Sequence, residues 1–65
     1  MIYIVPFVGN STDATIAEVW CATQIQDGYY RQPDGADQYE FGFLNPFEAQ
    51  RFRDSYRDNS KPIRV

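Results

Sequence analysis

The sequence predicts a small α+β fold in which an antiparallel β-sheet packs against a C-terminal helix. Three observations support this: a β-branched and aromatic run at residues 2–8, polar–apolar alternation at 38–44, and a strong helix start at 45–48. At 65 residues the chain has the size of one small domain, residues 1–65. We expect a meander of three to four strands, then one helix on one face of the sheet and a short terminal strand.

The first expected strand spans residues 2–8, which are rich in β-branched and aromatic side chains. Pro6 has no N–H to donate to a ladder, and this favours an edge strand or a bulge at that position. Two further strands are expected at 29–32 and 38–44, and Gly42 is a candidate bulge in the second of them. Together these segments predict the antiparallel sheet.

Residues 13–26 fit two interpretations. As a strand, the segment places β-branched and small residues on one face and leads into Asp27-Gly28, a frequent hairpin turn. As a helix, Ser11 or Asp13 would cap it, and its apolar stripe would comprise Ile16, Val19, Trp20 and Thr23. We prefer the strand. The helical alternative gives the order βαββαβ, a ferredoxin-like arrangement that would put Pro6 in a central strand.

A turn at residues 33–35 should join the two later strands. Proline presets φ there, aspartate bonds its own backbone, and glycine accepts a positive φ. The flanking acids Asp34, Asp37 and Glu40 lack the spacing of a calcium-binding loop, so we expect them to be solvated turn residues without a metal.

The C-terminal helix has the clearest signature. Asn45 is a favoured N-cap, Pro46 occupies the first helical position, where its missing N–H costs nothing, and Glu48 stands where a capping box requires it. The stripe that should face the sheet comprises Ala49, Phe52 and Tyr56. The helix is expected to end near residues 58–60, before the terminal strand at 61–65.

The net charge of −3 is unevenly distributed. Residues 1–50 carry seven acidic side chains and one basic side chain, a net −6, whereas residues 51–65 carry five basic and two acidic ones, a net +3. The apolar start of the chain lacks a basic region and is shorter than the ~20 residues of a spanning helix. An unpaired cysteine, Cys21, suits a reducing compartment. We therefore expect a cytoplasmic protein with no membrane partner.

Catalytic and cofactor-binding patterns are missing from the sequence. It has no histidine, one cysteine, and no nucleophile-elbow, phosphate-loop or dinucleotide-loop motif. An internal disulfide and a Cys/His zinc site are therefore excluded. Cys21 is expected to be a small buried hydrophobic residue, because free cysteine is among the most buried residue types. We expect no enzyme activity and no cofactor.

Five tyrosines, five phenylalanines and one tryptophan are a large aromatic content for so short a chain. Small domains without disulfides or metals often depend on association, so we expect a homo-oligomer such as a homodimer, or a complex with another protein. The preferred hypothesis is a small protein-binding module that docks on a larger protein and inhibits or modulates it. The composition is similar in type to small inhibitors of phages and mobile elements, although no motif is shared. The candidate contact residues are Tyr29, Tyr30, Tyr39, Arg53 and Arg57.

The alternative hypothesis concerns nucleic acids. The chain would bind single strands through tyrosine stacking and the basic residues Arg53, Arg57, Lys61 and Arg64, or it would act as an acidic mimic on a nucleic-acid enzyme. Asp54 and Asp58 alternate with the helical arginines, which is typical of a self-neutralised solvated face. The acidic body also disfavours a duplex-sized basic footprint, so nucleic acid is the less favoured partner.

Overall fold

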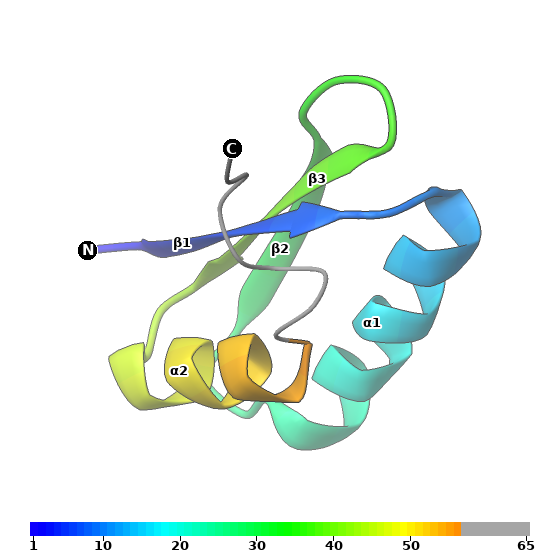
Figure 1. Ribbon diagram of the computed structural model, residues 1–65. Helices are drawn as coiled ribbons and strands as arrows, with labels where there is room; N and C mark the ends of the chain where they lie inside the picture. Colours follow the sequence, from blue (N-terminus) through cyan, green and yellow to red (C-terminus); the bar gives the residue numbers. More distant parts are fainter. Residues whose placement is uncertain (57–65) are drawn as a thin grey trace.

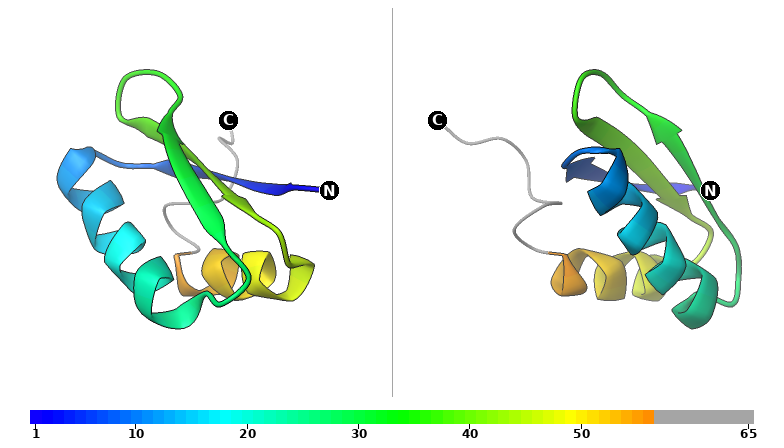
Figure 2. Two further views of the ribbon diagram at one scale, coloured as in Figure 1. Left: turned by 180° about the vertical axis from the view of Figure 1, so that it is seen from behind. Right: turned by 90° about the vertical axis from the view of Figure 1, so that its right-hand side faces the viewer.

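The computed structural model describes residues 1–56. Its elements, in chain order, are β1 (Tyr3–Val8), α1 (Ser11–Gln24), β2 (Tyr29–Pro33), β3 (Gln38–Phe43) and α2 (Pro46–Ser55). The three strands form an antiparallel sheet with β3 between β1 and β2, and both helices pack on one face of it (Figures 1 and 2). The predicted α+β class, with a small antiparallel sheet and a C-terminal helix packed on it, is confirmed. The terminal strand predicted at 61–65 lies outside the described residues.

The preferred strand at residues 13–26 is wrong, because this segment forms helix α1. Asn10 caps the helix: its side chain accepts from the backbone N of Asp13, and the Asp13 carboxylate accepts from the backbone N of Asn10. This reciprocal capping box satisfies backbone donors that a helix start leaves unpaired. The residues at the start of α1 therefore favour a helix, although the β-branched composition of the segment favours a strand.

The buried stripe of α1 also differs from the stripe expected for the helical alternative. Ala14, Ala17 and Cys21 are fully buried, at positions i, i+3 and i+7, whereas Ile16 and Val19 are exposed by 57% and 60%. Small side chains allow the helix to lie close to the sheet, and this close packing stabilises a helix of low intrinsic propensity. The order βαββα of the described residues therefore follows the alternative, and the preferred meander is wrong in its second element.

The hydrophobic core lies between the sheet and the two helices. Its strand residues are Val5, Phe7, Phe41 and Phe43. They occupy alternate positions on β1 and β3, so one face of the sheet is turned inward. Phe52 of α2 meets this face with its ring centroid 4.7 Å from that of Phe41 and 5.1 Å from that of Phe43. The predicted packing of the Ala49, Phe52 and Tyr56 stripe is confirmed, although α2 ends earlier than expected, at Ser55.

Pro6 lies in β1, opposite Glu40 of β3. The backbone N of Gly9 donates to the O of Asp37 at 2.8 Å, which continues the same register. Because hydrogen-bonded and non-hydrogen-bonded pairs alternate, the nitrogen of Pro6 points away from β3. Within residues 1–56 no strand pairs with the other side of β1, so the prediction of an edge position is confirmed for this part of the chain.

Four local predictions need correction. Asp27-Gly28 is no hairpin turn but links α1 to β2, with Gly28 at φ +108°. Gly42 is no bulge, because it pairs regularly with Ile4 and Tyr30. Glu48 does not close a capping box on Asn45, because its carboxylate accepts from the backbone nitrogens of residues 26 and 27 instead. The turn predicted at 33–35 is displaced by one residue: Pro33 ends β2, and residues 34–37 make the connection to β3, with Gly35 at φ +107° and Asp37 at φ +55°.

Candidate functional site

The face of the sheet that points away from the helices carries the candidate site. We call it the open face, and its residues are Ile2, Ile4, Pro6, Val8, Tyr30, Gln32, Gln38, Glu40, Gly42 and Leu44. The strand register arranges them in rows. Ile4, Gly42 and Tyr30 lie directly opposite one another across the three strands, and Pro6, Glu40 and Gln32 form the next row. The open face thus changes from apolar to polar along the strands.

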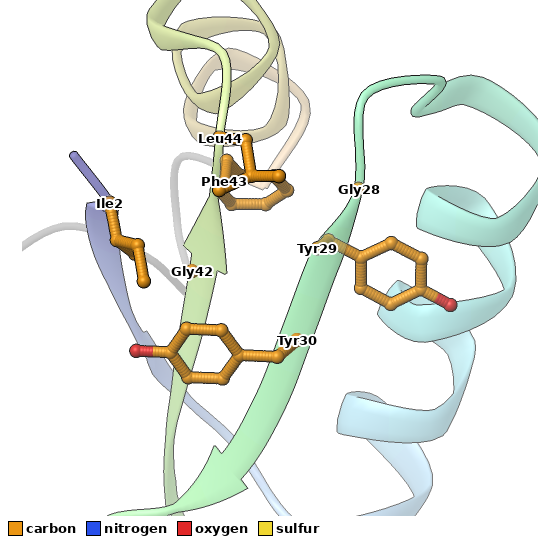
Figure 3. Close-up of a pocket in the computed structure, with 7 residues that line it drawn as sticks. All are labelled: Ile2, Gly28, Tyr29, Tyr30, Gly42, Phe43 and Leu44. Atoms are coloured by element: carbon orange, nitrogen blue, oxygen red, sulfur yellow. The ribbon is translucent and has the colours of Figure 1, made fainter.

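A shallow pocket of about 220 Å³ lies at the apolar end of the open face. Gly28 and Gly42 leave space in it, and Ile2, Leu44 and the ring of Tyr30 project around them (Figure 3). Ile2 is 50% exposed and Leu44 57% exposed. Aliphatic side chains on a hollow surface, half exposed and next to an aromatic ring, are typical of a site that binds an apolar group.

The ring of Tyr30 lies across β3 at Gly42 and forms one side of the pocket (Figure 3). A Cβ atom on Gly42 would stand 2.1 Å from the Tyr30 ring, so only glycine permits this arrangement. The Tyr30 hydroxyl donates to Oε2 of Glu40 at 2.7 Å, and Nε2 of Gln32 donates to the same oxygen at 3.2 Å. The hydrogen bond to Glu40 raises the pKa of Tyr30, so the phenol stays a donor at neutral pH.

Replacing Gly42 with alanine is expected to close the pocket. The added methyl group must displace the Tyr30 ring and break its bond to Glu40, which costs about 1 kcal/mol of unfolding free energy, because the ring lies on an uncovered face and can turn away. Denaturant titration measures the cost. In a Tyr30→Ala background the same change should be neutral or stabilising, because alanine suits a strand better than glycine. An equal cost in both backgrounds would contradict the predicted clash.

The predicted tyrosines do not share one surface. Tyr30 lies on the open face, whereas Tyr29 points toward α1 on the other side of the sheet (Figure 3), which confirms that consecutive residues face opposite ways. Tyr39 is half-buried on the helix side, where the guanidinium carbon of Arg31 lies 5.5 Å from its ring centroid. Burial, followed by the nearby carboxylate of Glu18, raises the pKa of Tyr29.

One predicted arginine borders the open face only at Ile4, and the other lies outside the described residues. Arg53 is exposed on α2 and lines a groove between this helix and β1, beside Ile4 and Ala49. Arg57 lies beyond residue 56 and receives no structural description. The sequence therefore grouped five candidates that the described structure does not bring together.

Comparisons with protein-family models, curated proteins and solved structures returned no match. The function is therefore inferred from the geometry of the chain itself.

Outside the open face, the reactive and metal-binding side chains of residues 1–56 form no further candidate site. Cys21 is fully buried, as predicted, and burial, with a smaller effect of the Glu18 carboxylate, raises the pKa of its thiol to about 12. A thiol that stays protonated at neutral pH is a poor nucleophile. Within the described part of the chain, no three side chains of the metal-binding types gather at one point, and no helix is long and apolar enough to cross a membrane.

Sequence reasoning missed the aliphatic residues of the site, namely Ile2, Ile4 and Leu44. The alternation in residues 38–44 does separate two faces of one strand, and this was the available signal. It did not show which face the helices would cover. The covered face depends on the position of α1, and most residues of this helix were predicted to form a strand of the sheet.

Proposed function

We propose that this protein is a non-enzymatic binding module that docks on a larger protein through the open face and inhibits or modulates it. One observation carries the proposal: both helices pack on the same side of the sheet, so an aliphatic and aromatic surface is left without cover from residues 1–56. Exposed apolar groups that adjoin one another on one face are characteristic of interaction sites in soluble proteins.

The residue types on the open face support this proposal. Ile4 is 47% exposed, and it shares a row with Tyr30, which combines a large apolar ring with a polar hydroxyl. Such aromatic residues are enriched in interface centres, where a polar rim surrounds an apolar core. On the open face, Glu40 and Gln32 supply polar groups beside the apolar rows.

The site is also built on a stiff support. The Gly42 backbone is held in the central strand between β1 and β2, and the Tyr30 side chain is fixed by its hydrogen bond to Glu40. A surface that is ordered before binding loses less conformational entropy when a partner docks. This preorganisation favours recognition of a specific partner over adaptable association.

The nucleic-acid alternative gains no support from the site. Glu40 places a carboxylate next to Tyr30, where a stacked base would bring its phosphate. Of the four basic residues on which that hypothesis relied, only Arg53 is described, and it lies in the groove beside α2. We therefore propose protein docking as the sole function.

A capture experiment with matched variants tests the proposal. The tagged full chain is incubated with an extract of its native host, and bound proteins are compared by quantitative mass spectrometry. Ile4→Thr combined with Leu44→Thr removes aliphatic groups from the open face. We expect the specific partners of the unmodified protein to fall by about tenfold or more, the effect of losing interface anchor residues.

The control variant combines Ile16→Thr with Val19→Thr. These residues have similar exposure, but they lie on the outer surface of α1. Circular dichroism confirms that both variants are folded. The proposal predicts that the α1 variant captures the same proteins as the unmodified chain. Equal capture by the open-face variant, or loss confined to the α1 variant, would place the contact elsewhere.

A further inference from the structure

We infer that the partner presents an aliphatic side chain beside a lysine or arginine, in a basic and apolar segment that lies along the open face. This inference rests on the proposed function and adds the chemistry that the open face recognises. It follows from Tyr30, because its ring lines the apolar pocket and its hydroxyl donates to the carboxylate of Glu40.

The pocket of about 220 Å³ is the part of the open face that would bind the aliphatic side chain. Its free space lies above Gly28 and Gly42, between Ile2, Leu44 and Tyr30 (Figure 3). Aliphatic and aromatic groups line it, so the group that enters should itself be apolar. An aliphatic side chain of a partner protein meets this requirement.

The residue that would bind the lysine or arginine is Glu40, in the row adjacent to Gly42 and Tyr30. Tyr30 and Gln32 both donate to Oε2 of this carboxylate. We therefore expect the cation of a partner to approach Oε1. Since the Tyr30 ring lines the pocket and its hydroxyl holds Glu40, the aliphatic group and the cation must be neighbours in the partner.

Arg31 and Arg51 bond to groups other than this carboxylate. Arg31 belongs to the helix side of the sheet, where its Nη1 lies 3.3 Å from Oε1 of Glu18. Arg51 donates to Gln24 of α1. The acids Asp34 and Asp37 stand in the turn before β3, which adds negative charge near the end of the strand that holds Glu40. A cationic partner complements this charge.

The same charge distribution disfavours two other occupants. A symmetric pairing of two copies through the open face would bring the same acidic patch twice into one interface. A phosphate backbone would meet Glu40 directly. The rows of the open face are two residues apart along β3, about 7 Å. A partner segment therefore matches when its aliphatic and basic residues lie two positions apart in a strand, or within one turn of a helix.

Selection from a library of short random peptides displayed on phage tests the inference. The full-length protein is immobilised, and the selected peptides are sequenced and then synthesised. We expect them to contain an aliphatic residue at the stated spacing from lysine or arginine. In Glu40→Gln, which keeps the shape and an oxygen acceptor, their affinity should fall about two- to fivefold and lose most of its salt dependence. Ile4→Thr with Leu44→Thr should weaken binding further.

The outcomes separate the two proposals. Suppose that the selected peptides lose affinity for the Ile4→Thr, Leu44→Thr variant but carry no basic residue, or that they bind Glu40→Gln as well as the unmodified protein. Either result would overturn this inference and leave the proposed function standing. A selection that enriches no peptide, or only peptides sensitive to Ile16→Thr with Val19→Thr, would contradict both. Acidic selected peptides would reverse the assigned charge and overturn the inference directly.

Discussion

Replacing Phe52 with alanine is expected to leave most of the protein unfolded at room temperature. The Phe52 ring is fully buried, and its centroid lies within 6.3 Å of the ring centroids of Phe7, Trp20, Phe41, Phe43 and Tyr56. Removing such a ring costs about 3–5 kcal/mol of unfolding free energy, from lost transfer energy and the cavity left behind. The core of a domain this small rarely supplies more than about 3–5 kcal/mol in total.

Phe47→Ala is the matched control, since Phe47 is the same residue type in the same helix. Its side chain is 78% exposed, so its truncation should change stability by less than about 0.5 kcal/mol. Urea titration followed by circular dichroism measures both variants. Comparable losses in the two variants would contradict the assignment of Phe52 as the centre of the core.

Replacing Glu48 with alanine should cost about 1.5–3 kcal/mol of unfolding free energy. Glu48 is buried, and its carboxylate accepts from the backbone N of Gln26 at 2.9 Å and from that of Asp27 at 3.3 Å. These bonds tie the segment after α1 to the first turn of α2. Hydrogen bonds to a charged acceptor are stronger than neutral ones, and the negative charge also suits a helix N-terminus.

Asp54→Ala is the control for the loss of a carboxylate from α2. Asp54 is exposed and accepts one side-chain hydrogen bond, from Gln50 at 3.0 Å, so its removal should cost less than about 0.5 kcal/mol. Glu48→Gln, which retains one carbonyl oxygen, should fall between the two. If thermal and urea unfolding gave the same stability for Glu48→Ala and Asp54→Ala, the link between the helices would have no energetic importance.

The proposed function makes the open face the part of the molecule to test first. Tyr30 was predicted as a contact residue, and the structure puts it between the apolar pocket and Glu40. Tyr29 and Tyr39 were also predicted as contact residues, but both pack against the core on the helix side of the sheet. Consecutive aromatic residues on a strand cannot act on one surface, because their side chains alternate.

The sequence by itself determined the elements whose signals are local and agree with one another. Asn45 caps α2, and Pro46 begins it at a position where no N–H is needed. In the turn before β3, Gly35 takes the positive φ that glycine favours, and the strand that follows also rests on local backbone chemistry. In each case the residue types that favour the conformation are the residues that adopt it.

Tertiary packing decided the conformation of residues 11–24, and the position of the resulting helix left the candidate site uncovered. The β-branched residues Thr15, Val19 and Thr23 favoured a strand, but in α1 they are exposed, while Ala14, Ala17 and Cys21 fill the interface with the sheet. Propensity differences of a few tenths of a kcal/mol per residue are smaller than the gain from burying a helix face, so packing prevails. Because α1 lies on the same side as α2, the opposite face of the sheet stays open, and no local pattern could have shown that.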